Sequence, residues 1–422
     1  MIEALANAFK VPDLKRRILF TLAMIGIYRL GAHVPVPGVK VDALKSLFES
    51  SPLLGFVDLF AGGALSNFAV FALGIMPYIT ASIILSLLTI VIPTLQAWSK
   101  EGDVGQRKIT QWTRYLTLML ALVQSVSLTV LFQNQLRALG AAGSFTLATN
   151  ALIVLTLVAG TAFIMWLGEL ITQRGIGNGM SILIFASIIS RLPEAIYQTG
   201  VTGGAVTVVG LLVVLFAIIV SIIFVEKAQR RIPVQYAKRV VGRKVYGGSS
   251  TYIPLKVNSA GVIPIIFASS VLIFPATILQ MFKGGFSTTV TRLLDPSGAI
   301  YLSLYALLVI FFTYFYTAII FNPIDISDNM KKYGGFIPGV RPGKPTAGYL
   351  DRVLTRITLP GAFFLALIAI IPQILGKFLN IPFFQGGNFG GTSLLIIVGV
   401  ALETMRQIES QLLMRHYEGF LK

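Results

Sequence analysis

Residue types that usually carry out chemistry are scarce in this chain. It contains no Cys and two His, His33 and His416, which argues against disulfides, Cys nucleophiles and histidine metal clusters. It has no G-x-x-x-x-G-K-[ST] phosphate-binding loop and no evident Ser/His/Asp constellation. We therefore expect no enzyme activity, no metal and no cofactor. If the chain moves something uphill, the energy must come from a partner or a gradient.

Four short segments pair up by sequence and place isoleucines at matching positions. The segments are 74–82 (GIMPYITAS) with 261–269 (GVIPIIFAS), and 179–184 (GMSILI) with 391–396 (GTSLLI). Ile79 matches Ile266, and Ile184 matches Ile396. Ile75 lies one turn before Ile79 on the same helix face. A ring of such side chains would form a narrow apolar constriction, which holds water poorly and gates by dewetting. The alternative is that these residues make ordinary lipid or core contacts.

The composition indicates that these segments lie in a membrane. Of the 422 residues, 55% are hydrophobic and 12% are charged, whereas a soluble domain carries about 25% charged residues. Such a chain cannot cover itself with a water-exposed surface. This excludes a soluble enzyme, a free nucleic-acid-binding protein and a disordered tail.

Ten segments have the length and apolar character of a bilayer-crossing helix, which needs about 20 residues. They are Ile18–Val36, Ile75–Leu95, Tyr115–Phe132, Ala151–Thr172, Met180–Ile196, Val206–Val225, Ala260–Phe282, Ile300–Phe321, Leu359–Leu379 and Ser393–Leu413. We therefore expect an all-α polytopic membrane protein. Arg29 and Glu169 lie towards span ends, where long side chains can reach the interface.

Basic residues set the expected orientation. Lys and Arg total 34 against 17 Asp and Glu, for a net charge of +17. With the N-terminus in the cytosol, 26 basic residues fall on the cytosolic side and 7 in the outer loops. The positive-inside rule therefore predicts ten crossings with both termini cytosolic.

Ten crossings divide into two halves of five, residues 1–200 and 201–422. Because each half holds an odd number of spans, similar halves must insert upside down relative to each other. The paired segments support this division, since they open spans two and seven and spans five and ten. Transport pathways commonly lie at the interface of such repeats.

The stretch 58–74 does not fit a span. Gly62-Gly63 precedes about ten largely apolar residues, which are too few to cross the bilayer, and Gly74 and Pro77 separate them from span two. We expect a short re-entrant helix that is covered by protein and acts as a removable stopper on the outer side. The alternative is an interfacial helix that lies on the membrane surface.

Two long cytosolic loops, 226–258 and 322–358, concentrate basic residues. Those we single out are Arg230, Arg231, Lys238, Arg239, Arg243, Lys244, Arg341 and Lys344. Gly and Pro around Arg341 predict a tight tip that projects this side chain. Membrane topology and attraction to anionic lipid are sufficient to explain the positive charge, but they do not explain the Pro/Gly tip. The Pro/Gly tip favours docking of a partner with an RNA or acidic face.

Five motifs together resemble the bacterial SecY family, whose members are the central subunit of a protein-conducting channel. The motifs are 72–79 (ALGIMPYI), 174–179 (RGIGNG), 230–239 (RRIPVQYAKR), 254–258 (PLKVN) and 336–343 (FIPGVRPG). The similarity runs over essentially the whole chain. It implies two five-helix halves around a central hourglass pore, which passes unfolded secretory polypeptides across the bacterial cytoplasmic (inner) membrane.

The resemblance also assigns roles to residues. It implies that the five isoleucines seal the waist of the pore. It implies a plug over roughly 59–73, which includes Leu59, Phe60, Ala61, Gly62, Gly63, Ala64, Leu65, Ser66, Asn67 and Phe68. A lateral gate that releases apolar segments to lipid would lie between spans two and seven, near Ser86 and Asn258. Many family members carry Gln at the position of Ser86, so the polarity of the gate is a point of difference here.

The resemblance implies partners as well. The basic loops, with Arg341 foremost, would dock the SecA motor ATPase or the translating ribosome. The chain would pair with the small membrane subunits SecE and SecG. Signal-sequence-bearing preproteins would be the substrates, and membrane lipid would receive their apolar segments.

Two other functions suit a polytopic membrane protein. A secondary transporter would bury an ionisable residue near the midplane. An intramembrane enzyme would need an acid, base or nucleophile pair within its spans. Neither feature is evident in the sequence.

Overall fold

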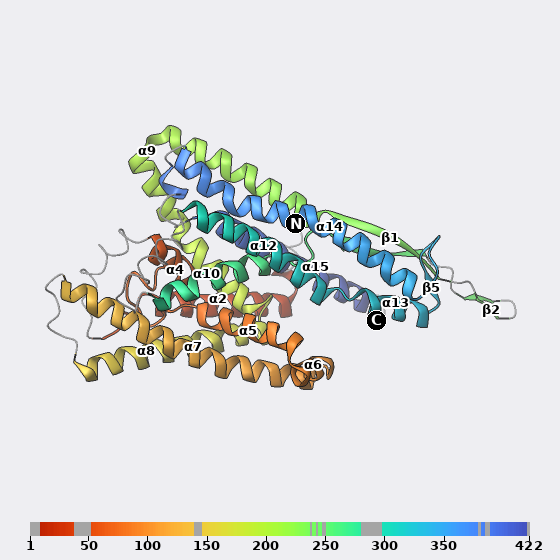
Figure 1. Cartoon of the computed structure of the whole chain (residues 1–422), viewed down its shortest axis with the longest axis horizontal. Helices are drawn as coiled ribbons and strands as arrows, with labels where there is room; N and C mark the ends of the chain where they lie inside the picture. The colour runs from red at the N-terminus through yellow and green to blue at the C-terminus, as the bar shows by residue number, and fades with distance from the viewer. Residues whose placement is uncertain are drawn as a thin grey trace.

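The structure is a computed structural model of the chain, and it describes residues 9–37, 52–138, 146–236, 239–241, 244–246, 250–279, 298–378, 381–384 and 389–419. It is a bundle of long helices with strands at one end (Figure 1). The helices are α2 (Pro12–Gly31), α4 (Pro52–Ala61), α5 (Met76–Val91), α6 (Pro93–Lys100), α7 (Asp103–Ala138), α8 (Leu147–Arg174), α9 (Gly179–Lys227), α10 (Ile263–Leu279), α12 (Ala299–Ile320), α13 (Pro323–Lys332), α14 (Lys344–Phe378) and α15 (Gly391–Gly419), with a 3₁₀ turn η1 (Pro382–Phe384). The strands are β1 (Gln229–Tyr236), β2 (Arg239–Val241), β3 (Lys244–Tyr246), β4 (Ser250–Lys256) and β5 (Gly335–Phe336). The predicted all-α polytopic membrane fold is confirmed.

Each of the ten predicted spans falls on a helix. Two of them, spans five and six, share α9, whose 49 residues are interrupted by Gly204 with φ 73° and ψ 178°. By length and composition, six helices of the described part of the chain could cross a membrane, or seven if the bent pair α5 and α6 forms one span. The apolar part of α10 is shorter, and α2 carries a basic run, Lys15-Arg16-Arg17, near its start.

Span two ends earlier than the sequence predicts. The helix α5 stops at Val91, and α6 leaves it at an angle of 100°. The cause is Pro93, because a proline disfavours the helical conformation of the residue before it. Ile92 accordingly adopts an extended conformation, with φ −95° and ψ 115°. The predicted continuation to Leu95 is therefore wrong.

Helices of each predicted half pack mainly on neighbours from the same half. In residues 1–200, α7 contacts α5 and α8, and α8 contacts α9, which begins in this half. In residues 201–422, α12 contacts α10 and α14, and α14 contacts α15. Elements on the two sides of the proposed boundary also touch: α10 contacts α5 and α7, and α9, which belongs to both halves, contacts α15. The division into inverted halves stays a prediction.

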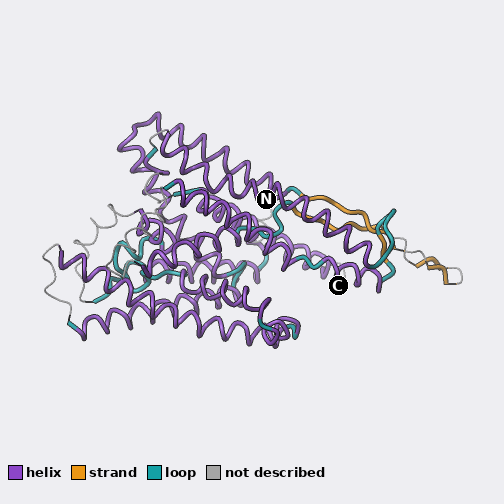
Figure 2. Tube along the Cα trace, viewed as in Figure 1, coloured by secondary structure: helices purple, strands orange, loops and turns teal. Residues whose placement is uncertain are grey.

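The two regions predicted as basic loops are largely folded and pack together. Strands β1 and β4 pair antiparallel, with Ile232 opposite Ile253, and β5 adds to the other edge of β1. A small separate core joins the strands to α13 and the first turns of α14; it contains Ile232, Val234, Leu255, Met330, Ile337, Leu350, Val353 and Leu354. We call these elements the sheet subdomain. Figures 1 and 2 show it at the end of the bundle opposite α4.

The helix α14 accordingly begins well before the predicted span nine. It starts at Lys344, whereas the hydropathy pattern predicts a span from Leu359. The extra turns are amphipathic, because Leu350, Val353 and Leu354 face the strands while polar residues lie between them. Hydropathy therefore detects the part of α14 that suits lipid and overlooks the part that packs on the sheet.

A bidentate ion pair links α7 to α8. Arg114 Nε donates to Glu169 Oε1 at 2.7 Å, and its Nη2 donates to Oε2 at 2.6 Å. The sequence suggests instead that Glu169 reaches the membrane interface alone. Such fork-to-fork pairs are among the stronger hydrogen-bonded contacts in proteins.

We expect Glu169→Ala to lower the free energy of unfolding by about 1–3 kcal/mol, because the Arg114 guanidinium loses its carboxylate. The measurement is thermal unfolding of the purified protein in detergent. Lys108→Gln is the matched control, since it breaks the more exposed pair between Lys108 and Glu101 and should cost less than about 1 kcal/mol. Equal shifts for the two variants would contradict this ranking.

Candidate functional site

The five isoleucines from the paired motifs are all buried. Ile75 precedes α5 and Ile79 lies in its first turn, while Ile184, Ile266 and Ile396 lie on α9, α10 and α15. Their exposed fractions lie between 0% and 7%, and all five belong to the main hydrophobic cluster. They therefore do not point to lipid as exposed side chains. Their convergence on one centre stays a prediction.

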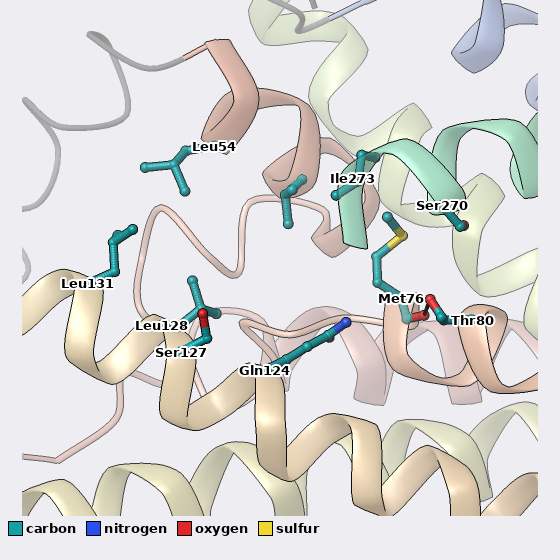
Figure 3. Close-up of a pocket in the computed structure, with 10 residues that line it drawn as sticks. Leu54, Met76, Thr80, Gln124, Ser127, Leu128, Leu131, Ser270 and Ile273 are labelled. Carbon is teal, nitrogen blue, oxygen red and sulfur yellow. Dashed lines mark hydrogen bonds between the residues drawn. The ribbon is translucent and has the colours of Figure 1, made fainter. Parts of the chain in front are cut away.

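A small cavity lies between α4, α5, α7 and α10 (Figure 3). Its volume is about 40 Å³, and its lining is mostly apolar. The helix α5 contributes Met76 and Thr80, and α10 contributes Ser270 and Ile273. The hydroxyl of Ser270 is buried without a hydrogen-bond partner. The interface between α5 and α10 is thus apolar but imperfectly filled.

The stretch predicted as a re-entrant helix over 59–73 has a different structure. The helix here is α4, which ends at Ala61, and residues 62–75 form successive turns. Gly62 and Gly63 have φ of 65° and 87°, a conformation that side-chain-bearing residues rarely adopt and that ends the helix. We call residues 52–75 the inserted segment. Ala64, Leu65 and other members of it are fully buried, so the predicted surface-lying alternative is wrong as well.

Asp58 organises the turns of the inserted segment. It is 1% exposed. Its Oδ1 accepts hydrogen bonds from the backbone N–H groups of Leu65 and Ser66, at 2.9 and 3.0 Å. Its Oδ2 lies 2.5 Å from Arg191 Nη2 on α9, and the same Nη2 donates to Ser66 Oγ at 3.2 Å.

Two residues of α2 bind the carbonyl groups at the end of α4. Arg29 Nη1 donates to the carbonyl of Gly62 at 2.7 Å. The hydroxyl of Tyr28 lies 3.3 Å from the carbonyl of Ala61 and 2.6 Å from Ser187 Oγ of α9. Side chains of α2 thus bind these two carbonyls, while other backbone groups of the segment bond within its turns or to Val34 and Val36.

Aromatic and backbone contacts hold the rest of the inserted segment. Phe71 stacks on Tyr28 of α2 and on Phe163 of α8, with centroid distances of 5.9 Å in each case. A Cβ at Gly160 of α8 would overlap the carbonyl oxygen of Val70. Glycine at 160 therefore permits α8 to approach the segment's backbone closely.

A larger, polar cavity lies beside the inserted segment. Its volume is about 630 Å³, and its lining includes Arg29, His33, Asp58, Arg191, Glu194 and Gln198. Figure 1 places α4 at the end of the bundle away from the sheet subdomain. Polar groups therefore gather around the inserted segment although the surrounding helices are apolar.

The two predicted gate residues, Asn258 and Ser86, lie on different elements and have different surroundings. Asn258, just before α10, is 3% exposed and donates from Nδ2 to Glu226 Oε1 at 2.6 Å and to the carbonyl of Gly261 at 3.0 Å. Arg406 of α15 donates to the backbone carbonyl of Glu226 at 3.0 Å. Ser86 lies half-buried on α5. Asn258 is therefore joined to the ends of α9 and α15.

The predicted docking residues that are described lie on the surface of the sheet subdomain. Arg230 and Arg231 of β1 are exposed, and the Arg231 guanidinium lies 4.8 Å from the ring centroid of Tyr252. Arg341 is exposed at the tip before α14, and Lys344, the first residue of α14, is exposed too. Lys238 and Arg243 lie outside the described residues, and Arg239 in β2 and Lys244 in β3 are described by their backbone.

Sequence reasoning missed the polar contacts of the inserted segment. It left Asp58 and Arg191 without a role and placed Arg29 at an interface. Asp58 lies outside the predicted spans, and its buried charge is paired with Arg191 and capped by two backbone N–H groups. One signal was available: lone charges within long apolar stretches are costly unless they are paired.

Comparisons with known proteins agree with this architecture. A model of the SecY family matches residues 69–405. Protein translocase subunit SecY of Streptomyces scabiei is 52% identical over 444 residues, and that of Mycobacterium tuberculosis is 48% identical over 447 residues; both alignments cover 100% of each chain.

Solved structures share the fold. One, described as the structure of a protein conducting channel, has a TM-score of 0.64 at 17% identity and covers 94% of this chain and 92% of its own. A second, of a SecY protein whose plug domain is described as stabilising the closed state of its channel, has a TM-score of 0.63 at the same identity and coverage. Sec61 in a canine ribosome-channel complex has a TM-score of 0.59 at 16% identity, again with 94% and 92% coverage.

We expect Gly160→Ala to destabilise the protein by about 1–3 kcal/mol, because the new methyl group overlaps the carbonyl of Val70 and forces the inserted segment or α8 to move. Gly210→Ala on α9 is the control, since nothing lies within 4 Å of a Cβ there. That change should be neutral or stabilising by about 0.5–1 kcal/mol, as is usual for Gly→Ala in a helix. Thermal unfolding measures both, and shifts of the same sign and size would refute the close approach.

Proposed function

The chain belongs to the SecY family, and from this premise we propose that it is a protein translocation channel. It passes unfolded secretory polypeptides across a membrane through a waist ringed by isoleucines. It also releases apolar segments sideways into lipid between α5 and α10. Family membership makes it a translocase subunit and not an enzyme.

The observation that carries this proposal is the burial of the five isoleucines on four different helical elements. All are at most 7% exposed and share one hydrophobic cluster. A closed ring of aliphatic groups excludes water and therefore blocks ions. Because such groups form no hydrogen bonds, the ring has no preference for a particular polar sequence. An extended polypeptide can pass through it while the side chains close around the chain.

The lateral gate is proposed at the contact between α5 and α10. These helices belong to different predicted halves and touch each other, and the 40 Å³ cavity between them is mostly apolar. An apolar signal helix can replace such contacts and then move into lipid. Asn258 borders this interface and is the polar contribution that we assign to the gate, together with Ser86.

The inserted segment is proposed to act as the plug. One relative by fold carries a plug domain that is described as stabilising its closed state. Here the segment is buried against α2, α8 and α9, and it leads directly into Ile75. A seal that continues into the ring would close the pathway twice.

The driving force is proposed to come from partners that dock on the sheet subdomain. The chain has no phosphate-binding loop, and Arg341 projects from a tip whose Gly339 and Gly343 have positive φ. A fold relative, Sec61, has been seen in a ribosome-channel complex. We assign docking of the SecA motor or the ribosome to this surface, with SecE and SecG as membrane partners. The location is the bacterial inner membrane with both termini cytosolic.

We expect Ile79→Asn and Ile396→Asn each to raise the resting ion conductance at least about tenfold, since a dewetting barrier lowered by about 1.4 kcal/mol changes a rate by that factor. The amide would hydrate the waist. The channel is reconstituted with its partner subunits in planar bilayers, and export of a preprotein with a weakened signal sequence is measured in parallel. Ile79→Val is the control, because it keeps the ring apolar. Normal conductance and normal export selectivity in both Asn variants would refute the ring.

We expect Arg341→Glu to reduce SecA-driven export about tenfold or more while thermal stability stays unchanged, since a reversed charge at a docking contact costs several kcal/mol. The side chain is exposed and takes no part in a core. Lys332→Glu on α13 makes the same change of charge elsewhere on the sheet subdomain and should reduce export less. An Arg341→Glu channel with wild-type export would remove the docking role of this residue.

A further inference from the structure

The inserted segment is attached to α9 through a carboxylate that serves two purposes. Asp58 accepts two backbone hydrogen bonds from Leu65 and Ser66, and it pairs with Arg191. Arg191 in turn donates to Ser66 Oγ. A single ion pair therefore fixes both the end of α4 and the turns that follow. Removing one partner leaves a nearly buried charge unpaired, which is strongly unfavourable.

Arg29 of α2 binds the same place from a second helix. Its guanidinium donates to the carbonyl of Gly62, and the neighbouring Tyr28 lies within reach of the carbonyl of Ala61. These carbonyls lie at the C-terminal end of α4, where the helix dipole favours a cation. Both α2 and α9 thus hold the point at which the chain turns back.

The contacts to the other half are of a different kind. Leu54 and Val57 of the inserted segment line the small cavity in Figure 3, and Ser270 and Ile273 of α10 line it too. Apolar surfaces of this type separate without the loss of a directional bond. The hydrogen bonds and the ion pair to α2 and α9 must be broken one by one if the segment is to leave them.

The ion pair is also within reach of water. Asp58 and Arg191 both line the 630 Å³ polar cavity, and the Arg191 side chain is 23% exposed. Polar groups of a polypeptide that enters this cavity can compete with Asp58 and Ser66 for the hydrogen bonds of the Arg191 guanidinium. The attachment can therefore be released from within the pathway.

We propose that Asp58 and Arg191, assisted by Arg29, form an ionic latch that holds the inserted segment against the N-terminal half of the channel. The segment moves out of the pathway when this pair is broken. Asp58 and Arg191 are positioning residues, since they set where the segment rests. The proposal rests on the translocation function proposed above.

The test follows the position of the inserted segment with a unique thiol. The chain has no Cys, so Ala64→Cys, at a position that is 0% exposed, introduces a single labelling site. A membrane-impermeant maleimide is added from the outer side to membrane vesicles that contain the complete channel complex. We expect slow labelling in the otherwise wild-type protein. Labelling should be about tenfold faster with Asp58→Asn or Arg191→Gln, because even a modest loss of stabilisation by the latch raises the population with an exposed thiol by about that factor.

A matched control and a double variant separate the latch from a general charge effect. Glu194→Gln alters a charge on the wall of the same cavity without touching the latch, and it should leave labelling slow. Asp58→Asn with Arg191→Gln should label about as fast as either single variant, because both changes remove one shared interaction. Three results would overturn the latch. They are labelling of Glu194→Gln as fast as that of the latch variants, labelling of the double variant at the product of the two single effects, and slow labelling of both single variants.

The same preparations distinguish failure of the latch from failure of the proposed function. Planar-bilayer conductance is recorded for the latch variants and for Ile79→Asn. A leak in Ile79→Asn alone, with Ala64→Cys protected in the latch variants, rejects the latch and leaves the channel function standing. The absence of leak in every variant, together with no preprotein export by the otherwise wild-type complex, rejects the channel function itself. Leak together with fast labelling in the latch variants supports both.

Discussion

Non-helical backbone at membrane depth needs a partner for each N–H and C=O group, either from the protein or from water in a cavity that it lines. Residues 62–75 are such a stretch within an otherwise helical bundle. This requirement explains why charged residues occur where the sequence is otherwise apolar. Asp58 supplies an acceptor for two N–H groups, and Arg29 supplies a donor for the carbonyl of Gly62. The polar network exists because the inserted segment is not a helix.

The helix α9 carries both the polar attachment of the inserted segment and one isoleucine of the proposed ring. On α9, Ile184, Ser187 and Arg191 are spaced three and four residues apart, which places them on one face. Arg191 therefore lies about 10 Å along the helix from Ile184, at 1.5 Å per residue. The inserted segment itself ends at Ile75, the N-cap of α5. A displacement of this segment consequently acts directly on the first residue of the proposed ring.

Hydropathy predicts the existence of the helices well, because lipid imposes one simple requirement on composition. It fails where a local or tertiary effect decides. Pro93 ends α5 early, and the packing of Leu350 on the sheet lengthens α14 beyond its apolar part. The turn at Gly62 depends on a positive φ. Glycine permits this conformation, but the presence of a glycine does not predict it. An apolar run after a glycine pair was therefore predicted as a helix when it is a set of turns.

The polar site was beyond sequence reasoning for a different reason. Arg29, Asp58 and Arg191 are far apart in the sequence. Each of these charged residues, taken alone, could simply face water at a membrane surface. Their meeting depends on how α2, α4 and α9 pack, which composition does not specify. Four of the isoleucines could be singled out because paired sequence motifs place them at equivalent positions. Repeated motifs draw attention to particular residues, whereas a network such as that of Asp58 leaves no such trace in the sequence.

The sheet subdomain connects the surface proposed for partner docking directly to the membrane helices. The tip with Arg341 leads into α14, which continues without a break from Lys344 to Phe378. Gly361 on this helix lies against the carbonyl of Val257, next to Asn258. The helix α14 also contacts α15, which carries Ile396. A partner that pulls on the tip therefore acts on one continuous element that touches both the proposed gate and the element bearing part of the ring. Under this proposal, a force on the tip reaches the proposed gate and the proposed ring through α14 without a further moving element.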